Sequence, residues 1–238
     1  MGIKERRERE RQELRQKILD ASCVLFAERG YEAVTMREIA KSIEYSATVL
    51  YKHFADKETL VRELCRQNFA VLAQRFIDAV SNGDALERFA RAGLVYLDFA
   101  AESPEHYRLM FMGELPPTPP EQGERDDPSR NAYVFVRSLT EELLHQGLLR
   151  KDLTDADLVA QTVWAGVHGA AALELTLANA ADWVDFKSRR ERFAAVLEVI
   201  ARGVARDPEA AASSLRRVLG AEPVPIGAPN RKLRKAGR

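Results

Sequence analysis

The chain has 238 residues, of which 46% are apolar and 30% charged, and its 36 Lys and Arg residues balance 36 Asp and Glu residues. This composition is ordinary for a globular protein and excludes collagen-like, low-complexity and disulfide-dense classes. No apolar run is long enough to cross a membrane, and the charged N-terminus is unlike a signal peptide, so no membrane partner is expected. Cys23 and Cys65 have no C-x-x-C partner, which indicates reduced thiols in a cytoplasmic protein.

Apolar residues recur with a helical period along the chain, and no convincing alternating strand pattern is found. The expected fold class is therefore all-α. Caps and helix breakers predict ten helices, at about residues 5–29, 35–42, 46–52, 57–81, 84–101, 104–112, 128–146, 155–179, 186–205 and 208–219.

Glycines and cap–proline pairs predict where these helices end and begin. C-terminal glycines are expected at Gly30, Gly83, Gly113, Gly147 and Gly220. A capping residue followed by proline is expected to begin helices at Ser103-Pro104, Asp127-Pro128 and Asp207-Pro208.

Two short helices joined by a tight turn are expected near the N-terminus. Thr35 and Glu38 have the spacing of a capping box at the start of the first, and Ser46 can cap the second. Such a pair forms a helix-turn-helix unit, which needs a third wall to bury its apolar face. Phe54 is expected to fill the junction. The first helix of the chain supplies that third wall through Leu14, Ile18, Ala21, Leu25 and Phe26.

The polar residues of this unit suit double-stranded DNA, because the first residues of a recognition helix face base edges in the major groove. That position falls to Ala47, Thr48 and Val49. Tyr51 and His53 each join an apolar body to a polar tip, which favours contact with the DNA backbone over core packing. On the first helix, Arg9, Arg11 and Arg15 could reach flanking phosphates, although a solvated helix face explains Arg9 and Arg11 equally well.

Residues 18–64 resemble the DNA-binding domain of the TetR family of transcriptional regulators. The similarity lies in the stretches F-A-E-R-G-Y, T-M-R-E-I-A and L-Y-K-H-F-A-D-K-E-T-L, which fall at the family's spacing. Glu44 stands where the family usually has a turn glycine. The resemblance implies phosphate contacts from Thr35, Tyr51, His53 and Lys57 and groove-facing positions for Ala47, Thr48 and Lys52, and Arg37 and Ser46 complete the expected DNA-binding set.

A second motif, Q-T-V-W-A-G-V-H-G-A-A-A-L, lies in the C-terminal half. Trp164 and His168 share a helix face, while Gly166 and Gly169 leave the helix bare enough for another helix or a ligand to approach. With P-E-H-Y-R-L-M-F upstream, the pattern resembles the W-H-G type of TetR C-terminal domain over roughly residues 84–200. The resemblance implies a homodimer through the helices at 155–179 and 186–205 and a small-molecule effector.

The expected effector-binding residues are mostly aromatic, and core packing is the alternative for each because aromatic and methionine side chains on helical faces more often form core. They are Tyr96, Phe99, Met110, Phe111, Tyr133, Trp164 and His168.

The sequence thus predicts a DNA-binding transcriptional regulator with three parts. These are a helix-turn-helix domain at 1–66, an effector-binding and dimerisation domain at 67–220, and a disordered basic tail at 221–238. The expected function is repression at a pseudo-palindromic operator, relieved by a small-molecule effector of unknown identity. The alternatives are an effector-independent architectural protein and a helical small-molecule carrier. No catalytic motif, metal-ligand spacing or cofactor fingerprint was found, so no enzyme activity, metal or cofactor is expected.

Overall fold

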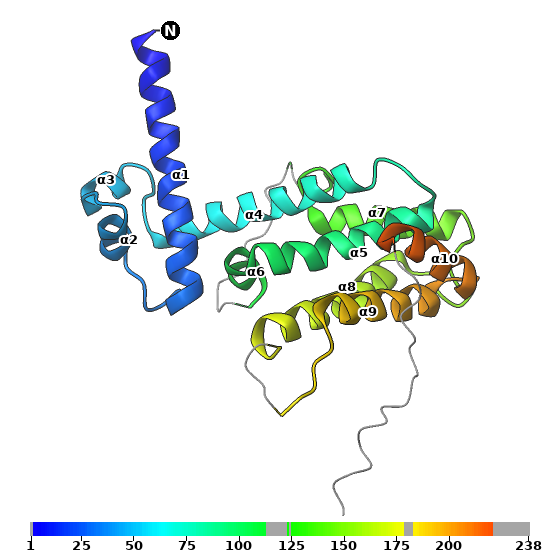
Figure 1. Ribbon diagram of the computed structural model, residues 1–238. Helices are drawn as coiled ribbons and strands as arrows, with labels where there is room; N and C mark the ends of the chain where they lie inside the picture. The colour runs from blue at the N-terminus through cyan, green and yellow to red at the C-terminus, as the bar shows by residue number, and fades with distance from the viewer. Residues whose placement is uncertain (1, 113–122, 124, 179–182, 221–238) are drawn as a thin grey trace, which may run out of the picture. The chain divides into compact units, whose positions relative to one another are not determined.

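The computed structural model describes residues 2–112, 123, 125–178 and 183–220, so Gly113 and the predicted tail at 221–238 lie outside the described residues. The described part folds into α-helices and has no β-strand, which confirms the all-α class (Figure 1). No helix in these ranges is long and apolar enough to cross a membrane. The helices are α1 (Ile3–Arg29), α2 (Met36–Ser42), α3 (Ala47–Tyr51), α4 (Lys57–Ala79), α5 (Ala85–Glu102), α6 (Pro104–Phe111), α7 (Ala132–His145), α8 (Ala156–Thr176), α9 (Arg189–Val204) and α10 (Pro208–Leu219).

Most helix ends lie at the predicted signals. The capping box at the start of α2 is confirmed, because the Glu38 N–H donates to Thr35 Oγ1 at 3.3 Å and the Thr35 N–H donates to Glu38 Oε2 at 2.8 Å. The prolines at 104 and 208 lie in the first turns of α6 and α10, as predicted. Positive φ angles confirm the expected C-terminal glycines Gly30, Gly147 and Gly220, whereas Gly83, also at positive φ, lies four residues after the end of α4 and two before the start of α5.

The predicted start of the helix at 128 is wrong. The Asp127 carboxylate accepts hydrogen bonds from the Ser129 N–H at 2.9 Å and the Ser129 hydroxyl at 2.6 Å, which closes a local turn. Asn131 instead caps α7, because its Oδ1 accepts from the N–H groups of Tyr133 and Val134. The side-chain acceptor that sets the true start at Ala132 therefore lies four residues after the predicted cap, Asp127.

The boundaries around α8 and α9 also differ from those predicted. Helix α8 ends at Thr176 rather than 179, and α9 begins at Arg189 rather than 186. Ser188 and Glu191 form a capping box at this point, with the Glu191 N–H donating to Ser188 Oγ and the Ser188 N–H donating to Glu191 Oε2. The box satisfies N–H groups that would otherwise lack partners and so fixes the start of α9.

The chain forms two compact units. Of the described residues, the first unit comprises 2–78, 98–112, 123 and 125–135, and the second comprises 79–97, 136–178 and 183–220. The core of the first unit gathers the apolar faces of α1, α2, α3 and the start of α4, with Phe54 only 1% exposed, as predicted. The predicted wall of α1 is confirmed, because Ile18 and Phe26 are buried in this core and Leu14, Ala21 and Leu25 pack against it.

The first turns of α1 lie outside this core. Residues 2–13 are all exposed, and in Figure 1 they extend beyond α2 and α3. Ion pairs one helical turn apart, such as Arg6 with Glu10 at 2.7 Å, support this stretch. Each such pair stabilises an isolated helix by about 0.2–0.5 kcal/mol.

In the second unit, α8 lies beside α9 (Figure 1). A Cβ atom at Gly166 would lie 2.7 Å from Ile200 Cδ1 on α9. The absence of a side chain at Gly166 therefore allows α9 to approach α8 closely, as predicted. A Cβ atom at Gly169 would meet nothing within 4 Å. The two glycines of the motif therefore differ, since contacts within the chain account only for Gly166.

Candidate nucleic-acid interface

Helices α2 and α3 form the predicted helix-turn-helix pair, with residues 43–46 between them. Ile39 and Leu50 are completely buried, and they hold the apolar faces of the two helices against α1. The opposite face of α3 is left in solvent, where Tyr51 is 53% exposed. Six of the predicted DNA-binding residues are exposed on this pair or at its ends, namely Thr35, Arg37, Ser46, Thr48, Tyr51 and Lys52, while Ala47 is half-buried.

The turn between α2 and α3 has an unusual backbone. Glu44 has a φ of 64° and is the one non-glycine residue with positive φ in the described part of the chain. This is the left-handed region, which a glycine adopts without steric penalty. The residue that departs from the TetR pattern thus sits in the conformation that the family's usual glycine would adopt freely.

Two residues beside this turn were not identified from the sequence. Lys17 Nζ donates to the Ile43 carbonyl oxygen at 3.3 Å and lies 5.5 Å from the centre of the Tyr45 ring. The Tyr45 ring is 43% exposed next to the start of α3. Lys17 therefore positions the turn, and Tyr45 presents an amphipathic side chain on the same side of the molecule.

The N-terminus of α2 already holds a carboxylate. Glu38 Oε2 accepts hydrogen bonds from both the N–H and the hydroxyl of Thr35, each at 2.8 Å, and Glu38 Oε1 accepts from Arg29 Nη2 at 2.7 Å. The hydrogen bonds from Arg29 and Thr35 lower the pKa of Glu38 to about 2. A phosphate bound at Thr35 would therefore compete with Glu38 for the same donors.

Lys57 lies at the start of α4 and contacts the loop between α1 and α2. Its Nζ donates to the carbonyl oxygens of Tyr31 at 2.9 Å and Val34 at 3.1 Å, and it lies 4.0 Å from the centre of the Tyr31 ring. Two of its three N–H groups are thus used within the protein. The predicted phosphate contact would depend on the third.

His53 is half-buried in the turn between α3 and α4. Arg15 Nη1 donates to the His53 carbonyl oxygen at 2.8 Å, and the Arg15 guanidinium carbon lies 4.2 Å from the centre of the Phe54 ring. Burial, followed by the positive charges of Arg11 and Arg15, lowers the pKa of His53. The lowered pKa favours the neutral imidazole form of His53 at neutral pH.

The seven predicted effector residues fall in both compact units. Tyr96, Trp164 and His168 belong to the second unit, and the other four belong to the first. Phe99 is 1% exposed and lies under Arg75, whose guanidinium carbon is 5.4 Å from the ring centre. Phe111 packs edge-on against Phe69 at 5.5 Å, whereas Met110 and Tyr133 are half-buried.

Tyr96, Trp164 and His168 are linked by hydrogen bonds. Trp164 Nε1, which can only donate, bonds to Tyr96 Oη at 3.0 Å, and Tyr96 Oη lies 3.1 Å from His168 Nδ1. Burial lowers the pKa of His168, which favours a neutral ring. Its Nδ1 can then accept a hydrogen bond from the Tyr96 hydroxyl. The two residues of the sequence motif are therefore joined by a tyrosine from α5.

Residues 18–64 match the bacterial regulatory proteins of the tetR family, and residues 89–200 match the tetracyclin repressor-like C-terminal domain. The chain belongs to the TetR family of transcriptional regulators. Its predicted role as a DNA-binding regulator is thereby confirmed, and the two matches agree with the predicted order of a helix-turn-helix followed by a helical body.

Among its relatives is the transcriptional repressor KstR2 of Mycobacterium tuberculosis, which is 32% identical over 165 residues, covering 65% of this chain and 80% of the repressor. The transcriptional activator FasR of Mycolicibacterium smegmatis is 32% identical over 110 residues, covering 42% of this chain and 47% of the activator.

Solved structures show the same fold. The structure of KstR2 from Mycobacterium tuberculosis has a TM-score of 0.59 at 22% identity and covers 81% of this chain and 95% of that one. A TetR family regulator from Marinobacter aquaeolei VT8 has a TM-score of 0.64 at 19% identity, with coverage of 84% and 98%.

Proposed function

We propose that this TetR family member is a homodimeric repressor that binds a pseudo-palindromic operator and leaves it when a small-molecule effector binds. The observation that carries this proposal is the face of α3, which buries Leu50 and presents Thr48, Tyr51 and Lys52 to solvent. The relatives named KstR2 are repressors, which favours repression here. Action on DNA implies a cytoplasmic location.

The two ends of the exposed face of α3 suit different parts of the DNA. Ala47 and Thr48 lie in the first turn of α3, where recognition helices contact base edges, and their methyl groups suit thymine methyl groups. Tyr51 and Lys52 at the other end suit the sugar–phosphate backbone. The remaining predicted phosphate contacts are Thr35, His53 and Lys57, and Arg37 and Ser46 complete the predicted DNA-binding set.

A homodimer is supported by the outer face of α8. Leu158 is 59% exposed and Leu173 is 47% exposed, and Ala165 and Gly169 lie between them at helical spacing. Val199 on the neighbouring α9 is 57% exposed. An apolar surface of this kind marks a protein–protein interface. A two-fold dimer would place two α3 helices on half-sites about 34–36 Å apart, or a multiple of that distance.

An effector site is supported by the Tyr96–Trp164–His168 hydrogen bonds in the second unit, because small-molecule sites join apolar walls to a few positioned polar groups. Effector binding weakens the operator complex only by its differential affinity for the two states of the protein. The boundaries at residues 66 and 220 and the effector roles of the other four residues stay predictions.

The test is selection of bound duplexes from a random DNA pool by the full-length protein, followed by a metabolite screen on the enriched site. We expect two inverted half-sites for the unaltered protein. Thr48→Ala should change base preference at one or two positions per half-site, with a change of about 1–3 kcal/mol at each position. Thr59→Ala is the matched control, because Thr59 is an exposed threonine on α4.

Failure to enrich any duplex would contradict DNA recognition by α3, and so would an equal change of base preference in both variants. An operator complex that responds to no metabolite would contradict the effector part alone and favour the architectural alternative.

A further inference from the structure

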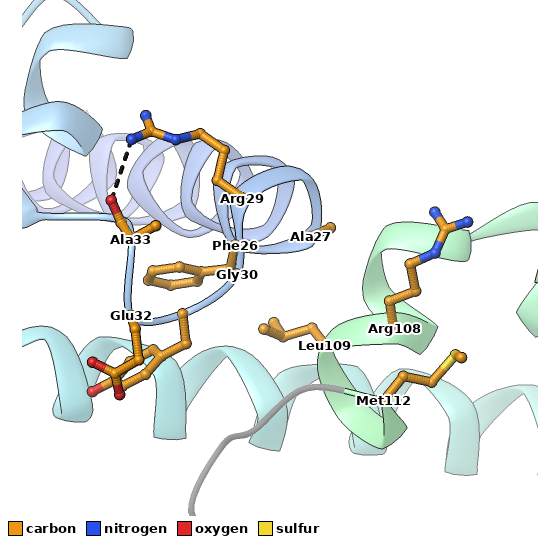
Figure 2. A pocket seen from close by; sticks show the side chains of 10 residues that line it. Phe26, Ala27, Arg29, Gly30, Glu32, Ala33, Arg108, Leu109 and Met112 are labelled. Atoms are coloured by element: carbon orange, nitrogen blue, oxygen red, sulfur yellow. Dashed lines mark hydrogen bonds between the residues drawn. The ribbon is translucent and has the colours of Figure 1, made fainter. Parts of the chain in front are cut away.

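A pocket of about 480 Å³ lies within the first compact unit, between the end of α1, the loop that follows it and α6 (Figure 2). This volume falls within the range of small-molecule sites, which is about 300–1,000 Å³. None of its lining residues belongs to the predicted effector set, and the pocket lies on the unit that carries α2 and α3. It is therefore a separate candidate site.

The inner wall of this pocket is apolar. Phe26 is 3% exposed and Leu109 is 5% exposed, and Figure 2 shows Leu109 projecting from α6 toward the side of Phe26 and Gly30. The Phe26 ring packs against the Tyr31 ring, with their centres 5.7 Å apart. Ala27, Ala33 and Met112 extend the apolar lining toward solvent. The lining therefore suits the hydrocarbon body of a ligand.

The charged residues around the pocket favour an anionic group. Arg29 at the end of α1 and Arg108 on α6 both line the pocket, and Glu32 is the one acidic residue in its lining. Arg29 uses Nη2 for the Ala33 carbonyl oxygen and Glu38, which leaves its Nε and Nη1 donors for a further acceptor. Guanidinium groups match the geometry of a carboxylate.

The loop wall of the pocket is held in place before any ligand arrives. Lys57 Nζ binds the Tyr31 carbonyl oxygen at 2.9 Å, and Arg29 Nη2 binds the Ala33 carbonyl oxygen at 3.2 Å. Two cations thus fix consecutive parts of a short loop. A fixed wall lowers the entropy lost when a ligand binds.

We propose that this pocket binds a small amphipathic carboxylate. Its apolar body would lie on Phe26, Leu109 and Met112, and its carboxylate would accept hydrogen bonds from Arg29 and Arg108. The site is distinct from the effector site proposed in the second unit, and its occupation does not depend on that site.

The first experiment measures equilibrium binding of 2-naphthoate, an aromatic carboxylate, to the full-length protein by titration calorimetry. Ala27→Phe places a ring in the pocket and should weaken binding by about tenfold or more, equivalent to about 1.4 kcal/mol. Val24→Phe is the matched control, because Val24 is exposed on the same helix and does not line the pocket. It should leave the affinity within about twofold.

The second experiment separates charge from shape and stands even if Ala27→Phe fails to fold. Arg108→Gln should weaken 2-naphthoate by about tenfold, because a hydrogen bond to a charged group is lost. The same variant should leave the neutral analogue 2-naphthylmethanol within about twofold of its original affinity. The proposal is overturned if the unaltered protein does not bind 2-naphthoate, or if neither Ala27→Phe nor Arg108→Gln weakens its binding.

Discussion

The ammonium group of Lys57 lies 4.0 Å from the centre of the Tyr31 ring and donates a hydrogen bond to the Tyr31 carbonyl oxygen at 2.9 Å. A second hydrogen bond reaches the Val34 carbonyl oxygen at 3.1 Å. One side chain thus ties the start of α4 to the loop that leads into α2. The residue that the TetR resemblance assigns to phosphate also stabilises the protein that presents α2 and α3.

Replacing Lys57 should reveal both roles. Lys57→Gln should lower the free energy of unfolding of the DNA-free protein by roughly 2 kcal/mol, because hydrogen bonds from a charged group are lost. It should also reduce the slope of log K against log salt by about 0.9 per subunit if the third N–H contacts a phosphate. Chemical denaturation and operator titrations at several salt concentrations measure the two effects.

Lys52→Gln is the matched control for that experiment. Lys52 is exposed at the end of α3, so its loss should change the salt slope without lowering the free energy of unfolding. An unchanged free energy of unfolding in Lys57→Gln would contradict the stabilising role of the Lys57 hydrogen bonds to Tyr31 and Val34. An unchanged salt slope would contradict the phosphate contact.

Glu44→Gly should stabilise the protein. Glu44 has a φ of 64°, a conformation that is unfavourable for a non-glycine residue by about 1–2 kcal/mol. Part of the gain is offset by the greater freedom of glycine in the unfolded chain, so we expect a net increase of roughly 0.5–1 kcal/mol in the free energy of unfolding.

Lys41→Gly provides the opposite case, since Lys41 lies within α2, where glycine should destabilise by about 1 kcal/mol. Thermal and urea unfolding measure the change in the free energy of unfolding for the two variants. A destabilised Glu44→Gly protein would show that the side chain of Glu44 matters more than its backbone.

Gly169→Leu should weaken the proposed dimer. In a single chain a Cβ atom at this position would meet nothing within 4 Å, so a side chain can begin there without a clash at its Cβ atom. Against a second copy it would push apart the small-residue face of α8, and overpacking of this kind is unfavourable by about 1–3 kcal/mol. Sedimentation equilibrium should therefore show a dissociation constant raised by about tenfold.

The control for this substitution is Lys151→Leu, which adds the same side chain at an exposed position before α8. If both variants dimerise with the same dissociation constant as the unaltered protein, the dimer interface lies elsewhere.

Acid should destabilise the protein through His168. Burial lowers the folded-state pKa of His168 below its usual 6.5. As the pH falls below about 6.5, the unfolded chain therefore binds a proton that the folded protein does not, and the free energy of unfolding decreases until the folded pKa is passed. Unfolding curves between pH 8 and pH 5, spanning that value by about 1.5 units on either side, measure this slope.

The pH dependence of the free energy of unfolding is compared between the unaltered protein and His168→Gln. The difference gives the contribution of His168 separately from that of His53, whose pKa is also lowered. Parallel pH profiles for the two proteins would contradict the assignment.

The sequence was sufficient wherever a local pattern determines structure. The Thr35–Glu38 capping box, the terminal glycines and the apolar face of α1 all depend on residues within a few positions of one another, and the structure confirms them. The start of the helix after Pro128 was mispredicted, because Asp127 and Asn131 are both able to cap. In the structure the Ser129 N–H donates to Asp127 and the Tyr133 N–H donates to Asn131, so it is Asn131 that caps the helix.

Contacts between distant residues could not be predicted from periodicity. Lys57 binds carbonyl oxygens 26 and 23 residues earlier in the chain, and backbone carbonyl groups leave no signal in the residue types. The spacing of Trp164 and His168 showed that they share a face, but it gave no indication that Tyr96 bridges them across 68 and 72 residues. Such partners depend on how the helices pack.

The exposed start of α1 has a consequence for the extent of DNA that one subunit covers. With a rise of about 1.5 Å per residue, the eleven residues from Ile3 to Glu13 form a rod of roughly 16 Å. That length is close to half a turn of a duplex, and its internal ion pairs keep it straight without support from the core. If Arg9 and Arg11 contact flanking phosphates, trimming the rod residue by residue would shorten a nuclease footprint in steps and leave the reading of the central bases intact.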